Sequence, residues 1–143
     1  MPGIVVSADG SADSQQALEW AMTHAALEHA PLTVLTVHQV AASAWTGSPI
    51  IYPRDRHEAE KAMRATEKSV ITTMSKLGDS RPSSVTVRAS IGQPAHALIE
   101  ASHDADMIVV GKGGHFTRSL PGSVSSHVMH HAACPVVVIS GQR

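Results

Sequence analysis

The sequence predicts an α/β fold: a single doubly wound, five-stranded parallel sheet of strand order 3-2-1-4-5, with helices on both faces in a Rossmann-like arrangement. Short segments rich in Val and Ile alternate with segments whose apolar residues recur at helical spacing, which is typical of parallel strands joined by helices. The strand segments are apolar at odd and even positions alike, as expected of strands covered on both faces. Because 143 residues without an internal repeat suit one hydrophobic core, we expect one domain over residues 1–143.

The first strand, the first helix and the second strand are expected at residues 4–6, 14–29 and 32–37. The run Ile-Val-Val is followed by Ala-Asp-Gly-Ser at 8–11, a turn sequence that ends the strand and supplies a cap for the helix. Pro31 closes the helical segment before the next Val/Leu-rich run begins.

A connection is expected at 41–56, followed by a long helix at 57–77 and a third strand at 85–89. The connection contains Ser, Gly and Pro, but it also carries Trp45 and other large apolar residues, which favours a segment that folds over a surface rather than a linker. The helix is apolar on one face and charged on the other, and Gly78 follows it.

The second half of the chain continues the alternation with shorter elements. A turn at 92–94 leads into a short helix through 97–99, and an apolar run at 105–110 predicts the fourth strand. A helix at 123–132 and a Val-rich strand at 135–139 complete the pattern. The last strand would lie at an edge of the sheet, where pairing with a second copy of the chain would cover its apolar residues.

The predicted strand order reverses between the first and fourth strands, and doubly wound sheets bind ligands beyond the strand ends at that point. The loops that meet there are residues 8–10 and 111–125; the second has a cluster of glycines after the fourth strand and a Gly-Ser pair at 122–123 before the last helix. Glycines let backbone amides approach phosphate closely, and a helix N-terminus adds free donors and the positive end of its dipole. We therefore expect a phosphorylated ligand, and a nucleotide in particular.

The composition argues against several classes of partner. The formal net charge is −1 and the only aromatics are two Trp, one Tyr and one Phe, so neither nucleic acid nor a membrane surface is an expected partner. No apolar run suits a signal peptide or a bilayer-spanning segment, and the single cysteine fits a reducing compartment. We expect a cytoplasmic protein.

The sequence also lacks familiar catalytic motifs: the P-loop pattern, a Gly-x-Gly-x-x-Gly turn after the first strand, and the Gly-x-Ser-x-Gly elbow of hydrolases. Asp9 is the only acidic residue expected near the crevice, whereas phosphoryl transfer needs a metal and an oriented nucleophile. His127 and His131 stand four apart on one predicted helix without an evident third ligand, so an exposed helix face is favoured over a metal site. Cys134 is interpreted as a small buried apolar residue rather than a nucleophile. We expect no efficient catalysis.

Seven stretches, taken in order, carry a family resemblance that spans nearly the whole chain. They are IVVSADGS at 4–11, ALEWA at 17–21, APLTV at 30–34, IGQPA at 91–95, DADMIVVG at 104–111, GSVS at 122–125 and HHAACPVVV at 130–138. In these stretches the chain resembles the universal stress protein family. The resemblance implies an α/β nucleotide-binding fold, often a homodimer joined through the last strands, and in many members ATP binding.

The resemblance further implies which residues form the nucleotide site. Members that bind ATP carry Gly-x-x-Gly, nine residues, and then Gly-Ser or Gly-Thr; here residues 111–114 supply the first part and 122–123 the last, with seven residues between them. Asp9 would bind the ribose or the base, and Val37 would pack on the adenine. The implied ligand is ATP, with Mg²⁺ as a possible companion, and the implied site residues are Ala8, Asp9, Val37, Val110, Gly111, Lys112, Gly113, Gly114, Gly122, Ser123, Val124 and Ser125.

Each implied role has a simpler structural alternative. Asp9 suits an Asx turn or a helix cap, and Val37 suits a plain core position. Ser123 and Ser125 suit helix N-caps, and glycines are common in ordinary turns after strands.

The sequence leaves three functions open. The first is an ATP-binding stress sensor or regulator that dimerises through Val136, Val137, Val138 and Ile139. The alternative is a family member with no nucleotide site that acts as a dimerisation and protein-interaction module. The loop, two residues shorter than the family pattern, and Pro121, which lacks an N–H donor, favour the alternative, whereas the intact Gly-Ser-Val-Ser at 122–125 favours the first. A slow ATPase or phosphate-ester enzyme that depends on Asp9 is a third hypothesis.

Overall fold

The computed structural model describes residues 3–40, 45, 50–113 and 123–140, and it contains a five-stranded, all-parallel sheet of order β3-β2-β1-β4-β5. The strands are β1 (Ile4–Ser7), β2 (Leu32–Gln39), β3 (Val85–Gly92), β4 (Met107–Gly111) and β5 (Val136–Ile139). The helices are α1 (Ala12–Glu28), α2 (Pro53–Leu77), α3 (Pro94–Ser102) and α4 (Ser123–His131), with a short 3-10 turn, η1 (Gly78–Ser80), after α2. The predicted fold class and strand order are confirmed.

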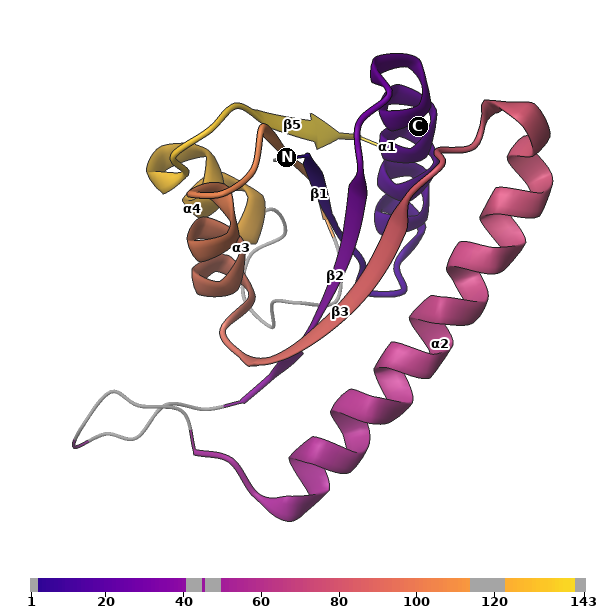
Figure 1. Cartoon of the computed structure of the whole chain (residues 1–143). Coiled ribbons are helices and arrows are strands. Elements are labelled where there is room, and N and C mark those ends of the chain that lie inside the picture. Colours follow the sequence, from indigo (N-terminus) through magenta and orange to yellow (C-terminus); the bar gives the residue numbers. More distant parts are fainter. Residues whose placement is uncertain (1–2, 41–44, 46–49, 114–122, 141–143) are drawn as a thin grey trace.

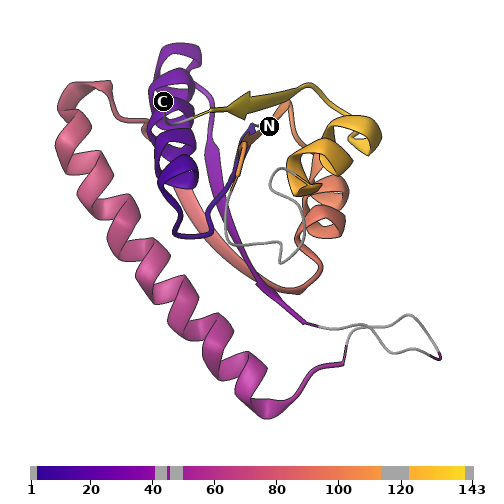
Figure 2. The ribbon, with the colours of Figure 1, turned by 180° about the vertical axis from the view of Figure 1, so that it is seen from behind.

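The helices lie in two layers on either side of the sheet. In Figure 1, α1 and α2 lie to the right of the sheet and α3 and α4 to its left, and Figure 2 shows the same division from behind. This division follows from the handedness of the crossovers, because right-handed connections place a helix on one face when the chain moves toward β3 and on the other when it moves toward β5.

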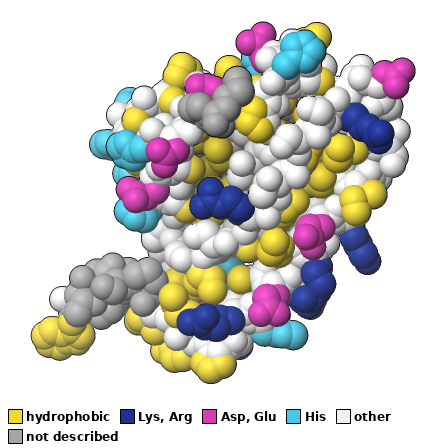
Figure 3. Space-filling model, in the orientation of Figure 1, with side chains coloured by type: hydrophobic (Ala, Val, Ile, Leu, Met, Phe, Trp, Pro, Cys, Tyr) yellow, Lys and Arg dark blue, Asp and Glu magenta, His cyan; other side chains and the backbone are white. Residues whose placement is uncertain are grey.

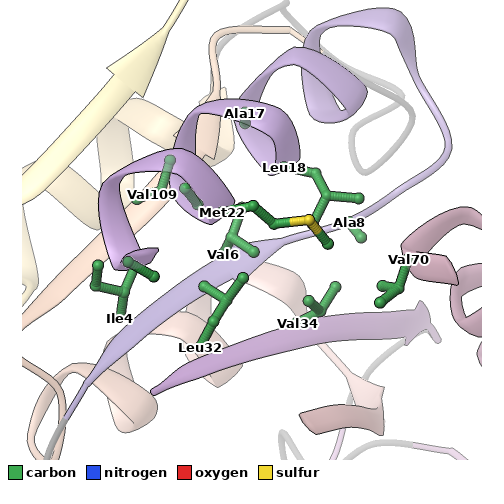
Figure 4. Packing of buried hydrophobic residues seen from close by; sticks show 12 residues of the cluster. Ile4, Val6, Ala8, Ala17, Leu18, Met22, Leu32, Val34, Val70 and Val109 are labelled. Carbon is green, nitrogen blue, oxygen red and sulfur yellow. The ribbon is translucent and has the colours of Figure 1, made fainter. Parts of the chain in front are cut away.

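Each face of the sheet has its own hydrophobic cluster. On the α1 side, Val6 and Val34 are fully buried against Leu18 and Met22 of α1 (Figure 4). On the other side, a second cluster includes Val5, Leu35 and Val37 of the sheet, Leu98 of α3 and Val128 of α4. Alternate residues of a strand point to opposite faces, so burial on both faces accounts for the strands being apolar at odd and even positions. Each large side chain buried in this way contributes about 1.5–3 kcal/mol.

Several elements extend further than the sequence predicts, among them β2, which runs to Gln39 rather than ending at 37. α2 begins at Pro53 rather than at residue 57, because proline fits the first helical position and Asp55 Oδ2 accepts a hydrogen bond from the backbone amide of Tyr52 at 2.8 Å. β3 continues to Gly92 rather than ending at 89, because it pairs with β2 along the whole of β2, up to Gln39.

The surface mixes charges and isolated apolar side chains. On the face seen in Figure 3, acidic and basic side chains are interspersed rather than gathered by sign. Leu27, Trp45 and Ile71 are the most exposed of the large apolar side chains among the described residues, at 72%, 96% and 66%; single exposed apolar residues are ordinary on protein surfaces. None of the described helices combines the length and the apolarity that crossing a bilayer requires.

Candidate functional site

The two loops that the sequence predicts to form the site begin side by side at the carboxyl edge of the sheet. β1 pairs with β4, with Val6 opposite Val109, so the residues that follow the two strands leave the sheet as neighbours. This is the point where the strand order reverses, and doubly wound sheets place their ligands there.

The segment between β1 and α1, residues 7–14, is called the β1–α1 corner. Asp9 Oδ1 accepts hydrogen bonds from the backbone amide of Ser11 at 2.9 Å and from its hydroxyl at 2.6 Å. Ser11 Oγ in turn caps α1 by accepting from the amide of Ser14 at 3.1 Å. Ser14 Oγ accepts from the amide of Asp9 at 3.0 Å and donates to the carbonyl of Ser7 at 3.4 Å. Asp9 therefore has the turn-forming role given as its simpler alternative, and Ser11 supplies the helix cap expected from this turn.

Gly10 completes this corner with a φ of +84°. This is the left-handed region that side chains with a Cβ rarely adopt. The turn therefore brings the Asp9 carboxylate back onto the start of the helix, and Asp9 is only partly buried there. A partly exposed carboxylate at a strand end can accept hydrogen bonds from hydroxyl groups of a ligand.

The segment 110–113, called the β4 end, is held against α1. The backbone of Gly111 approaches the main chain of Asp13 so closely that a Cβ on Gly111 would lie 2.9 Å from the Asp13 carbonyl carbon. The amide of Gly113 donates to Asp13 Oδ2 at 2.9 Å. The amide of Lys112 donates to the carbonyl of Ile139 at 2.9 Å and so continues the pairing of β4 with β5. An amide predicted to receive phosphate thus binds a carboxylate of the chain itself.

The start of α4 also contacts the β4 end, through Ser125. Ser125 is buried, and its hydroxyl lies 3.4 Å from the carbonyl oxygen of Lys112, to which it donates. Of the remaining predicted residues in this loop, Gly114 and Gly122 lie outside the described residues, as does the side chain of Ser123. The predicted phosphate contacts of these three residues stay predictions.

Four predicted site residues have apolar side chains that contribute to the core. Ala8, Val37 and Val110 are 8%, 7% and 2% exposed, and Val124 is half-buried against the cluster on the α3 and α4 side. The core role of Val37 is confirmed, and its contact with adenine stays a prediction. Lys112, which directly precedes Gly113 in the sequence, is exposed.

Sequence reasoning missed the part that Asp13 plays. Asp9 was expected to be the only acidic residue near the crevice, yet the carboxylate of Asp13 reaches the β4 end directly. In the sequence, Asp13 stands directly before the predicted first helix, and Gly113 lies 100 positions away along the chain. Nothing local in the sequence connects the two residues.

Two of the cavities that described residues line lie on opposite faces of the sheet. A cavity of about 260 Å³ between α1 and α2 is lined in part by Ala8, Gly10 and Ser11 and so touches the β1–α1 corner. A larger cavity, about 750 Å³, lies between α3 and the face of β2 and β3, with Arg88 and Glu100 among its lining residues. It contains none of the predicted site residues.

The other candidate reactive groups are unremarkable in their surroundings. Burial raises the pKa of the Cys134 thiol, and the nearby Asp106 carboxylate raises it further, which disfavours the reactive thiolate. The rings of His127 and His131 lie 4.7 Å apart on α4. Within the part of the chain that the structure describes, no group of three or more His, Cys, Asp or Glu side chains is arranged to hold a metal ion.

The family model and the curated relatives that match this chain point to the same family. A model of the universal stress protein family matches residues 2–140. A universal stress protein of Mycobacterium tuberculosis strain H37Rv is 36% identical over 141 residues, covering 96% of this chain and 47% of the relative. One from Mycolicibacterium smegmatis is 34% identical, covering 97% of this chain and 48% of the relative. The chain therefore spans about half the length of the curated relatives it matches.

Solved structures share the fold over nearly the whole chain. The universal stress protein UspA from Lactobacillus plantarum matches with a TM-score of 0.71 and 28% identity, covering 97% of both chains. A universal stress protein in complex with cAMP matches with a TM-score of 0.70 and 23% identity, covering 99% of this chain and 98% of the other. The universal stress protein from Archaeoglobus fulgidus in complex with dAMP matches with a TM-score of 0.64 and 24% identity, covering 98% of each.

Proposed function

The chain belongs to the universal stress protein family, and we propose that it binds an adenine nucleotide where β1 and β4 end side by side. The observation that carries this proposal is the meeting of the two loops: the register of β1 and β4 brings the Asp9 turn and the glycine backbone of residues 111–113 to one corner. Two proteins of the same fold are described in complex with cAMP and with dAMP, which supports an adenine ligand for this chain too.

The chemistry of the described residues suits an anionic ligand. The Gly113 amide donates a hydrogen bond to a carboxylate oxygen at 2.9 Å. A phosphate oxygen can accept a hydrogen bond from an amide in the same way. Gly113 has no side chain to keep a phosphate away from the backbone. The partly exposed carboxylate of Asp9 would accept hydrogen bonds from the ribose.

ATP is the nucleotide that the family resemblance implies, and we propose that the chain binds an adenine nucleotide without efficient turnover. A metal ion would be held chiefly by the phosphates and water, as Mg²⁺ commonly is, since no described cluster of acidic residues is arranged to hold it. Nucleotide binding would then act as a signal in a stress sensor or regulator, by changing the surface that the protein presents.

Isothermal titration and thermal unfolding with adenosine, AMP, ADP and ATP, each with and without Mg²⁺, test the nucleotide proposal. A ligand at a hundredfold excess over its Kd stabilises a protein by about 2.7 kcal/mol, which corresponds to a rise in Tm of several degrees. Asp9→Asn keeps an oxygen for the Ser11 amide, and we expect it to weaken binding about tenfold. Asp79→Asn, on the exposed turn η1, is the matched control and should bind as the parent does. No rise in Tm with any nucleotide at millimolar concentration would reject the proposal.

We also propose that two copies pair through β5. In the order β3-β2-β1-β4-β5, β5 has β4 on one side and an open edge on the other, as far as the described residues show. An open, Val-rich edge is a natural place for strand pairing. The curated relatives are about twice as long as this chain, which leaves room in them for a second unit of this size. Pairing of this kind would also serve the alternative function, a dimerisation and protein-interaction module without a nucleotide site.

The orientation of β5 gives a sharp test of this pairing. The carbonyls of Pro135 and Ile139 accept from β4, so the amide and carbonyl of Val138 point to the open edge, because neighbouring residues of a strand alternate in direction. Val138→Pro removes an outward donor and leaves the bonds to β4 in place. We expect the proline variant to sediment as a monomer at a concentration where the parent chain and Val138→Ala are dimers. A monomeric parent chain at micromolar concentration would reject the pairing.

A further inference from the structure

We propose that Asp13 is a built-in competitor for phosphate, which makes the site select adenosine and nucleoside monophosphates over ATP. The inference rests on the proposed function, since it concerns the charge that the same site accepts. It assigns to Asp13 a specificity-determining role in addition to its place in the first turn of α1.

The contact between Asp13 and the β4 end is close and involves two glycines. Asp13 Oδ2 accepts a hydrogen bond from the Gly113 amide at 2.9 Å. A Cβ on Gly113 would lie 3.3 Å from that same oxygen. The main chain of Asp13 fills the space beside Gly111, where a Cβ would come within 2.9 Å. A carboxylate therefore occupies the position at the Gly113 amide that an anionic ligand would need.

The position of Asp13 on α1 favours this arrangement in the nucleotide-free protein. Its carboxylate lies in the first turn of the helix, where the helix dipole stabilises a negative charge. It is also partly buried, so the surrounding water screens its charge less than it would at an exposed position. A phosphate that approaches Gly113 must displace this carboxylate and then tolerate it nearby.

The competition depends on the charge of the ligand. Adenosine has no phosphate and needs no access to the Gly113 amide, so Asp13 does not oppose it. AMP carries one phosphate, whereas the chain of three phosphates in ATP brings more negative charge into the corner shared by Asp9 and Asp13. Repulsion between like charges a few ångströms apart near a protein surface is expected to lower affinity about tenfold or more.

Calorimetric titration of the full chain with adenosine, AMP and Mg-ATP tests the inference. Asp13→Asn keeps the size of the side chain and an oxygen for the Gly113 amide, but removes the charge; Asp13→Ala removes both. Glu28→Gln, exposed in the last turn of the same helix, makes the same change of charge away from the site. We expect Asp13→Asn to raise the affinity for ATP about tenfold, to leave that for adenosine within about twofold, and Glu28→Gln to change neither.

The outcomes separate this inference from the nucleotide proposal. If adenosine or AMP binds, but ATP binds equally well to the parent chain and to Asp13→Asn, the competitor role is wrong and the nucleotide site stands. If none of the three ligands binds to any variant, the nucleotide site and the competitor role both fail. The contact itself has a readout without nucleotide, because the amide signal of Gly113 in a ¹⁵N–¹H correlation spectrum should move in Asp13→Ala and stay in Glu28→Gln. An unmoved Gly113 signal would overturn the inference.

Discussion

The β1–α1 corner and the β4 end lie side by side at the carboxyl edge of the sheet, yet they are held in place by different kinds of contact. In the β1–α1 corner, Asp9, Ser11 and Ser14 bond to one another and to Ser7 within at most seven positions of the chain. At the β4 end, the contacts reach much further, from Gly113 to Asp13 across 100 positions and from Lys112 to Ile139.

This difference teaches how much each corner depends on the rest of the fold. Local bonds between side chain and backbone form as soon as the turn forms, so the β1–α1 corner largely specifies its own shape. The β4 end takes its shape only when α1 and β5 have packed beside it. Substitutions at the β4 end should therefore disturb the packing of elements, whereas those in the β1–α1 corner should disturb the turn and the helix cap.

Gly111→Ala should have the largest effect, because it breaks the long-range contact. The new methyl group would lie 2.9 Å from the carbonyl carbon of Asp13, and backbone atoms of a packed helix cannot move aside cheaply. We expect a loss of about 2–3 kcal/mol of unfolding free energy, the upper part of the range for overpacked sites, measured by urea denaturation. We also expect faster hydrogen exchange at the Gly113 amide, because α1 and the β4 end must move apart to admit the methyl group.

Gly113→Ala is the matched control for this prediction. Its methyl group would lie 3.3 Å from Asp13 Oδ2, the end of a side chain that can rotate, so the expected loss is below about 1 kcal/mol. Equal losses for the two alanine variants would contradict the view that the main chain of Asp13 sets the close approach at Gly111.

Ser14→Ala should have the next largest effect, and it tests the local corner. The Ser14 side chain is 5% exposed and bonds both to the amide of Asp9 and to the carbonyl of Ser7. Removing its hydroxyl takes one hydrogen-bond partner from each of these backbone groups, at a cost of about 1–2 kcal/mol. The exposed Ser126→Ala on α4 serves as the control. A Ser14→Ala variant as stable as this control would show that the corner does not depend on its side-chain bonds.

The same distinction explains how much of the fold could be predicted. Strand and helix positions follow from the spacing of apolar residues, and a parallel sheet covered by helices follows from the alternation of elements. Both predictions are confirmed. The ends of elements depend on particular contacts. β3 reaches Gly92 only because β2 continues beside it to Gln39. α2 starts at Pro53, within a segment whose Ser, Gly and Pro residues are typical of a loop.

The candidate site divides along the same line. The turn role of Asp9 and the capping role of Ser11 could be predicted because both act on residues a few positions away. The contact of Asp13 with Gly113 could not, because a carboxylate in a first helical turn is equally well explained as favourable to the helix dipole. The glycine at 111 was noticed as a way to admit phosphate, whereas in the structure it admits the main chain of α1.

The smallest effect is expected at a third corner, between β2 and α2, which combines a local with a long-range contact. Asp55 accepts from the backbone amide of Tyr52 at 2.8 Å and lies 2.9 Å from Nε2 of His38, on β2. These partners, the Tyr52 amide foremost and His38 after it, hold the pKa of Asp55 below its usual value of 3.8. The unfolded chain therefore binds a proton at this site more readily than the folded chain does. The stability that Asp55 contributes is complete above pH 3.8 and is lost as the pH falls through the lower folded value.

Urea unfolding of the parent chain and Asp55→Asn at a series of pH values from about 6 to about 2 tests this sign. We expect the difference between the two chains to be greatest at the upper end and to shrink below pH 3.8, with a small amplitude because the group is close to solvent. His38→Ala then separates the two contacts. If the local amide dominates, this variant keeps most of the pH dependence. If the dependence disappears with His38, the long-range partner controls the corner, and the β2–α2 corner is closer in kind to the β4 end than to the β1–α1 corner.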